Sequence, residues 1–210
     1  MKAPFLVIVG TLVLAPPVTG VFVRRRLSGA RAWVFWWGVS QAVESLLQYG
    51  LALRGTPNLW VGYVFEPVSG ALLLWALSLW HGAPGTRRAL RLAIPVVLAA
   101  YLWLTIAFDG TSLFSRAAQP ALYLVCLGAS AWTLVERSRT AEGDPLRSDW
   151  LWICVGLALF YATGSTLLPL ARLLFASDRH LFDLAYEIAN LVAGLAFLSV
   201  ARGLACPTVT

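Results

Sequence analysis

The sequence predicts an all-α integral membrane protein with seven transmembrane helices. Of its 210 residues, 59% are hydrophobic and 12% are charged, whereas a soluble domain averages about 25% charged residues. The hydrophobic residues occur in runs of about 20, the length that an α-helix needs to cross a bilayer. These runs predict a single membrane domain, residues 1–210, with helices near 3–23, 31–53, 59–81, 89–108, 116–136, 149–171 and 181–201.

The first hydrophobic run resembles a secretory signal peptide but lacks a cleavage site. The stretch "MKAPFLVIVGTLVLAPPVTG" begins near a basic residue and continues with apolar residues, as signal peptides do. No Ala-x-Ala site follows it, and three arginines at 24–26 end the run. We therefore interpret this stretch as the first transmembrane helix, and we expect Pro16 and Pro17 to kink it.

The basic residues lie in short clusters between the hydrophobic runs, and their distribution predicts the orientation of the chain. Cytoplasmic loops of membrane proteins are enriched in Lys and Arg. With the N-terminus outside, the inner side holds eleven basic residues, at 24–26, 31, 87, 88, 91, 137, 139, 147 and 202. The outer side then holds only Lys2, Arg54, Arg116, Arg172 and Arg179. We expect an N-out, C-in topology, which explains the net charge of +6 without nucleic acid.

An internal repeat is visible when the third helix is aligned with the seventh. "YVFEPVSGALLLWALSL" and "LAYEIANLVAGLAFLSV" then place Glu66 on Glu187, and each glutamate follows an aromatic residue. The second helix aligns with the sixth, where Glu44 falls on Tyr161, and the first aligns loosely with the fifth. The alignments predict a 3+1+3 parallel repeat, with three-helix units at 1–81 and 116–201 and a connector helix at 89–108.

Seven helices in a 3+1+3 arrangement, with the N-terminus outside, resemble the SWEET and PQ-loop transporters and the KDEL-receptor fold. The resemblance is architectural and covers the whole chain. The Pro-Gln pair of PQ-loop proteins is reversed here, as Gln119-Pro120. The chain also resembles small seven-helix proteins of some bacteria that carry a glutamate in the second and third helices. The first resemblance implies transport of a small solute, and the second implies no activity.

Polar residues lie at similar depth in four of the predicted helices. At 1.5 Å per residue, Glu44, Glu66, Tyr161 and Glu187 lie roughly 9–14 Å below the outer helix ends. Residues at helical spacing extend these polar faces. The candidate ligand-binding or proton-relay residues are Gln41, Glu44, Gln48, Tyr63, Glu66, Tyr161, Glu187 and Asn190.

These polar faces predict a shared cavity that is open to the outside. A carboxylate at the centre of a bilayer costs about 2.5–3.5 kcal/mol on insertion scales, so the faces should turn inward. No Lys or Arg lies at this depth, and desolvation and mutual repulsion favour the protonated form of at least one carboxyl group. Such a site suits a proton relay, and it equally suits a cation or an amine.

Hydrogen bonding between helices is the alternative explanation of buried polar residues. We favour this alternative for Gln41, Ser69 and Ser165, and a solvated helix end for Asp183. Three carboxylates exceed what helix association needs. We therefore favour a functional cavity for the three glutamates.

The sequence has no signature of a cofactor, a metal site or a catalytic nucleophile. The seventh helix lacks the lysine that a retinal Schiff base needs. The two histidines, His81 and His180, lie at helix ends, where we expect them at the membrane interface. The three cysteines at 126, 154 and 206 show no C-x-x-C spacing, and no G-x-S-x-G occurs. We expect no cofactor, no metal and no enzymatic activity.

Three functions remain open. The repeat and the intramembrane carboxylates favour a small-solute transporter, which could be coupled to protons. The alternative is a sensing module that binds a ligand outside and signals through a partner protein. It is favoured because the inner halves of the helices show no equivalent polar residues. The third is an intramembrane lipid enzyme with Glu44 and Glu66 as acid and base.

The expected surroundings of the chain follow from the same observations. They are the lipid bilayer, a small-molecule ligand or proton, and a second copy or a membrane partner protein, with no nucleic acid. The composition, rich in Ala, Leu, Arg and Gly, suggests a GC-rich bacterial genome and therefore a bacterial inner membrane. The tryptophans of the second helix could form a protein or lipid contact.

Overall fold

The computed structural model describes residues 10–111, 114–140 and 144–207, and all regular structure in these ranges is helical. The helices are α2 (Ala15–Phe22), α3 (Ala30–Leu53), α4 (Leu59–Trp80), α5 (Pro84–Leu104), α6 (Ala118–Thr140), α7 (Asp149–Ser177) and α8 (Arg179–Ala205). A π-helical turn, Thr105–Asp109, extends α5. Short 3-10 turns lie at Arg24–Arg26 and Pro145–Arg147.

Five of these helices are long and apolar enough to cross a membrane: α4, α5 with its extension, α6, α7 and α8. The prediction of an all-helical fold is confirmed, and the length and composition of these five helices are compatible with an integral membrane protein. α3 has 24 residues and is about 36 Å long, but Arg31, Glu44 and two glutamines lower its mean hydropathy. The first predicted span falls partly on residues 1–9, outside the described residues, and its described part is Gly10–Phe22.

The largest differences from the sequence-based boundaries of the fully described spans lie at the start of α5 and the end of α7. α5 begins at Pro84 rather than near residue 89, because proline is well suited to the first turn of a helix. α7 continues through Pro169 to Ser177, so that only Asp178 separates it from α8. The Asp178 carboxylate accepts a hydrogen bond of 3.0 Å from the backbone N–H of Leu181. This bond caps α8 immediately after α7 ends.

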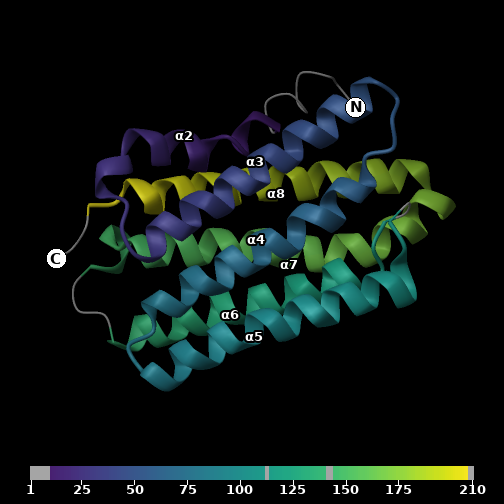
Figure 1. The fold of residues 1–210 in the computed structure, drawn as a ribbon. Coiled ribbons are helices and arrows are strands. Elements are labelled where there is room, and N and C mark those ends of the chain that lie inside the picture. The colour runs from purple at the N-terminus through teal and green to yellow at the C-terminus, as the bar shows by residue number, and fades with distance from the viewer. Residues whose placement is uncertain (1–9, 112–113, 141–143, 208–210) are drawn as a thin grey trace.

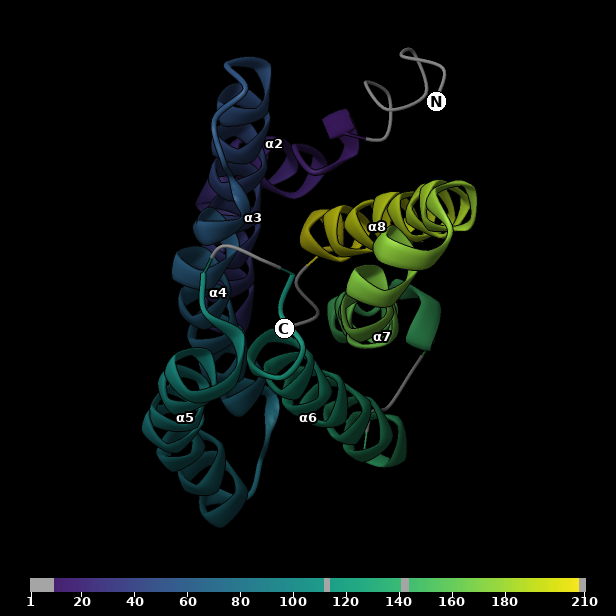
Figure 2. The same cartoon turned by 90° about the vertical axis from the view of Figure 1, so that its right-hand side faces the viewer.

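The helices run side by side as an elongated bundle (Figure 1). Contacts join α2 to α3, α3 to α4, α4 to α6, α6 to α7, α7 to α8 and α8 back to α2. Six helices therefore form a closed ring, which is visible when the bundle is viewed end-on (Figure 2). α5 packs outside the ring against α4 and α6. Consistent with this outside position, only 17% of its most hydrophobic window is buried.

The two ends of the bundle carry different connections. The connections from α3 to α4, α5 to α6 and α7 to α8 lie at one end, which we call the α3–α4 end. The connections from α2 to α3, α4 to α5 and α6 to α7 lie at the opposite end, which we call the α4–α5 end. Most of the arginines lie at the α4–α5 end. One of them, Arg31, is buried and donates a hydrogen bond to the carbonyl of Leu204, which joins α3 to α8.

Glycines allow α7 and α8 to pack closely. A Cβ atom added to Gly156 would lie 2.6 Å from the carbonyl oxygen of Ala196, and one added to Gly203 would lie 2.8 Å from that of Asp149. Both obstacles are backbone atoms, which cannot turn aside as a side chain can. Small residues at such crossings are typical of membrane helix packing.

Pro67 interrupts the backbone hydrogen bonding of α4 beside Glu66. Proline has no N–H, so the carbonyl of Tyr63, four residues earlier, loses its usual partner. The hydroxyl of Tyr101 on α5 points to this carbonyl oxygen at 3.5 Å. The proline is therefore accommodated by a side chain from the neighbouring helix, as expected where no water is present.

Asp109 organises the connection between α5 and α6. Its carboxylate accepts hydrogen bonds from the backbone N–H groups of Arg116, Ala117 and Ala118 at 2.8–3.1 Å, and from the hydroxyl of Ser115. A carboxylate at a helix N-terminus satisfies N–H groups that have no partner within the helix. The cap fixes the start of α6, which carries two residues of the cavity described below.

Candidate functional site

A cavity of about 300 Å³ lies inside the helix ring, toward the α3–α4 end. Its walls come from α3, α4, α6, α7, α8 and the segment that precedes α6. Six of the eight candidate residues line it: Gln41, Glu44, Gln48, Tyr63, Glu66 and Asn190. The helical spacing of the polar residues on α3 and α4 thus places them on one wall.

Glu44 and Glu66 are the two acidic residues of the cavity. Only 7% of Glu44 and 5% of Glu66 is exposed. Oε1 of Glu44 accepts a hydrogen bond of 3.1 Å from Gln48 Nε2, and Oε1 of Glu66 accepts one from the hydroxyl of Tyr123. The second oxygen of each carboxyl group, Oε2, is buried and has no hydrogen-bond partner in the described part of the chain.

No described basic side chain compensates these two carboxyl groups. The described residues that line the cavity include no Lys, Arg or His. Among the described residues, no ion pair involves Glu44 or Glu66; the ion pairs found involve Glu136, Asp144 and Asp183. The cavity is therefore a site of negative potential whenever either carboxyl group is ionised.

Glu187, the third glutamate of the predicted set, does not line the cavity. The wall formed by α8 consists of Tyr186, Ala189, Asn190, Ala193 and Phe197. Their spacing places them on one face of α8. Successive residues of an α-helix are rotated by about 100°, so Glu187, which follows Tyr186, points away from this face. Glu187 is accordingly half-buried beside this face.

Tyr161 also lies outside the cavity, in the core behind it. It is fully buried, and its hydroxyl accepts a hydrogen bond of 3.0 Å from Trp37 Nε1. Its ring packs edge-to-face on Tyr123, with centroids 5.1 Å apart. Tyr161 thus supports the tyrosine that donates to Glu66.

The residues that we assigned to helix packing form hydrogen bonds of ordinary length with other protein groups. Gln41 Nε2 donates to Ser69 Oγ at 3.0 Å and so joins α3 to α4, although Gln41 also lines the cavity. Ser165 donates to the carbonyl of Ala162 in its own helix. Asp183 is exposed and lies 3.9 Å from Arg179, as expected for a solvated helix end.

Sequence analysis missed the contribution of α6. Gln119 and Tyr123 line the cavity from this helix, and their spacing of four residues puts them on one face. The same spacing rule that identified α3 and α4 could have found them. It was not applied there because α6 has no carboxylate at this depth.

Two glycines make room for the polar side chains of the cavity. A Cβ atom on Gly62 would lie 2.9 Å from Gln119 Nε2 and 3.3 Å from Glu44 Oε1. A Cβ atom on Gly164 would overlap the ring of Tyr123. Side chains at either position would displace the groups that surround the carboxylates.

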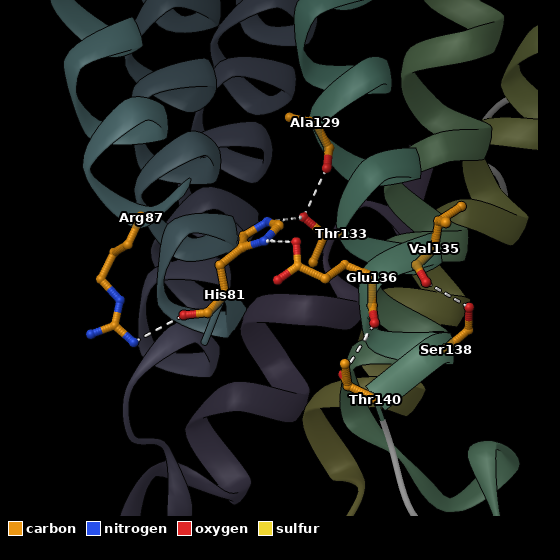
Figure 3. A network of polar contacts seen from close by, with 8 residues as sticks. All are labelled: His81, Arg87, Ala129, Thr133, Val135, Glu136, Ser138 and Thr140. Atoms are coloured by element: carbon orange, nitrogen blue, oxygen red, sulfur yellow. Dashed lines mark hydrogen bonds and ion pairs between the residues drawn. The ribbon is translucent and has the colours of Figure 1, made fainter. Parts of the chain in front are cut away.

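A second polar cluster lies at the α4–α5 end and corrects one prediction (Figure 3). His81 was expected at the membrane interface, but only 1% of it is exposed. Its Nδ1 lies 2.6 Å from Glu136 Oε2, and its Nε2 lies 3.0 Å from Thr133 Oγ1. Both partners come from α6. His81 lies at the end of α4, where we expected an interfacial side chain, but α6 covers it.

The hydrogen bonds of this cluster define its proton content. The Thr133 hydroxyl donates its only proton to the carbonyl of Ala129, so it can only accept from His81, and Nε2 must carry a proton. One further proton lies between Nδ1 and the Glu136 carboxyl group. The pair is therefore either an imidazolium beside a carboxylate, or a neutral histidine beside a protonated glutamate.

The metal-ligating and thiol side chains of the described residues form no further cluster. No group of three or more His, Cys, Asp or Glu side chains there could hold a metal ion. Cys126, Cys154 and Cys206 are free and buried. Comparison of the chain with protein-family models, with curated proteins and with solved structures finds no match.

Proposed function

We propose that this chain is a small-solute transporter of a bacterial inner membrane, rather than an enzyme. The observation that carries the proposal is the cavity itself. It holds two buried carboxyl groups, each with one oxygen that has no partner in the described part of the chain. Two such groups are costly inside a membrane, and a solute or proton site explains why they are retained.

The proposal includes seven transmembrane helices, with the N-terminus outside and a 3+1+3 repeat. α3 has the length of a span, and its polar residues Gln41, Glu44 and Gln48 line the cavity. The arginines of the α4–α5 end favour a cytoplasmic location for that end. The cavity then lies on the outer side, as in an outward-facing transporter of the SWEET type.

A route across the membrane needs polar groups beyond the cavity, and α4 and α6 carry them. Ser78, His81 and Thr133 are buried at the α4–α5 end of the same two helices that hold Glu66 and Tyr123. Leu73, Leu77 and Cys126, which lie between these positions along α4 and α6, belong to the buried hydrophobic core. The buried polar residues of this end weaken the asymmetry that favoured a sensor.

Access to the cavity from each side of the membrane tests the proposal without knowledge of the solute. Ser45 lines the cavity and is half-buried, and a cysteine there differs from it by one atom. The native cysteines are buried, so the wild-type chain provides a background of low labelling. A membrane-impermeant maleimide is applied to right-side-out and inside-out vesicles that contain Ser45→Cys.

A transporter that alternates between outward-facing and inward-facing states should label in both kinds of vesicle, with the slower rate reporting the rarer state. Labelling in right-side-out vesicles alone would contradict transport. That result would support the second candidate, a sensor whose cavity stays closed to the cytoplasm.

A further inference from the structure

The two unpartnered carboxylate oxygens define what the cavity would bind. Glu44 Oε2 and Glu66 Oε2 are buried, and each belongs to a side chain that is more than nine-tenths buried and lines the cavity. A buried acceptor without a donor is destabilising, and more so if it is charged. The two oxygens therefore favour a ligand that donates hydrogen bonds.

Neighbouring protein donors are directed at the other oxygen of each carboxyl group. The Tyr123 hydroxyl has one proton and gives it to Glu66 Oε1. Gln48 Nε2 donates to Glu44 Oε1. These contacts use Oε1 of each carboxyl group, so Oε2 is the acceptor that lacks a donor in the described part of the chain.

The ligand should also carry a positive charge. Among the described side chains, the cavity wall contains two acidic residues and no basic one. An anion would meet these carboxyl groups with no described cation to offset the repulsion. A neutral donor would leave the charge of an ionised carboxylate uncompensated, and a buried uncompensated charge is strongly unfavourable.

The walls favour an organic cation over a metal ion. Calcium needs six to eight oxygen ligands, and the described residues contain no group of three or more His, Cys, Asp or Glu side chains that could hold a metal ion. The cavity volume of about 300 Å³ matches the lower end of small-molecule sites, roughly 300–1,000 Å³. Six aromatic rings line it: Tyr63, Phe114, Tyr123, Phe160, Tyr186 and Phe197. Aromatic faces attract organic cations and pack against apolar groups.

We infer that the cavity binds a small primary or secondary organic ammonium ion, whose N–H groups donate to Glu44 Oε2 and Glu66 Oε2 while its apolar body contacts the aromatic wall. A quaternary ammonium has the same charge but no N–H group, so it should bind less well. The inference rests on the proposed transport function and names its substrate class.

Calorimetry on the full chain in lipid nanodiscs tests the inference with 2-phenylethylamine as the probe. Two comparison ligands separate charge from hydrogen bonding: 2-phenylethanol is neutral, and trimethyl(2-phenylethyl)ammonium is charged without N–H groups. We expect the amine to bind at least about tenfold more tightly than either, since it alone can make charged hydrogen bonds to the buried carboxyl groups.

Matched variants locate the binding site. Glu44→Gln and Glu66→Gln should each weaken amine binding by at least about tenfold. Glu187→Gln is the control, because it makes the same change on α8 outside the cavity wall, and it should leave binding unchanged. If a cavity variant fails to fold, the three-ligand comparison on the wild type still decides.

Three outcomes would overturn the inference: no binding of the amine, equal binding of amine and alcohol, or equal loss in Glu187→Gln and Glu66→Gln. The cysteine-labelling test needs no ligand, so it separates the two proposals. Labelling from both sides without amine binding would support transport but show that the substrate is not an amine. Labelling from one side with amine binding would contradict transport and support a sensor that binds amines.

Discussion

Tyr123 connects the acidic cavity to the aromatic core of the bundle. Its hydroxyl donates to Glu66, while its ring packs against Tyr161 and against Phe160, whose centroid lies 5.9 Å away. Tyr123→Phe keeps the ring and removes only the donor. Both oxygens of Glu66 would then lack a partner, and we expect a stability loss of about 1–3 kcal/mol. Thermal unfolding in nanodiscs measures this loss as a lower melting temperature.

Tyr49→Phe is the control for Tyr123, because the Tyr49 side chain is largely exposed on α3. A double-mutant cycle with Glu66→Gln then isolates the contact itself. Equal melting temperatures for Tyr123→Phe and Tyr49→Phe would show that the hydroxyl contributes nothing.

The His81–Glu136 pair should contribute to stability at the other end of the bundle. His81→Ala removes the hydrogen bonds to both Glu136 and Thr133. We expect a loss of about 1–2 kcal/mol, because His81 is buried but Glu136 is partly exposed. Arg147→Ala breaks the exposed Arg147–Asp144 pair of 3.6 Å and should have almost no effect. Similar melting temperatures for the two variants would contradict a structural role for His81.

At the scale of the helices, close packing between α7 and α8 fixes the orientation of α8. Gly156→Ala would place a Cβ atom 2.6 Å from the carbonyl of Ala196, so the helices must separate. We expect a loss of about 1–3 kcal/mol. Gly128→Ala on α6 is the control, since a Cβ atom there meets nothing within 4 Å. A melting temperature for Gly156→Ala equal to that of Gly128→Ala would show that the helices do not constrain each other here.

The direction in which each helix face points explains which predicted site residues line the cavity and which do not. Helical spacing grouped Glu44 with its glutamine neighbours and Glu66 with Tyr63, because both faces turn toward the cavity. The same reasoning failed for Glu187, since the rotation of α8 depends on its packing against α7 and not on its own polar residues. His81 was misplaced because Glu136, 55 residues away in sequence, lies on a helix whose contact with α4 no local pattern reveals.

At the scale of the whole molecule, hydrophobic run lengths predicted the helices well, since each span needs about 20 apolar residues wherever it packs. The order of helices around the ring, and the place of α5 outside it, follow from contacts between distant segments. The small-residue positions that permit those contacts, such as Gly156 and Gly203, resemble any other glycine in a hydrophobic run. The lengths of the hydrophobic runs therefore predict where the helices lie in the sequence, but they do not predict which helices pack against each other.

The orientation of the whole chain is tested by cysteines in two connections that only α4 separates. Thr56→Cys lies at the α3–α4 end, and Gly82→Cys lies at the α4–α5 end, where an added Cβ atom meets nothing within 4 Å. If α4 spans the membrane, an impermeant maleimide must label the two from opposite sides.

The arginines near Gly82 favour the cytoplasm, so we expect Thr56→Cys to label in right-side-out vesicles and Gly82→Cys in inside-out vesicles. The reverse pattern would invert the topology and make the cavity face the cytoplasm. Labelling from one common side would show that α4 does not cross the membrane.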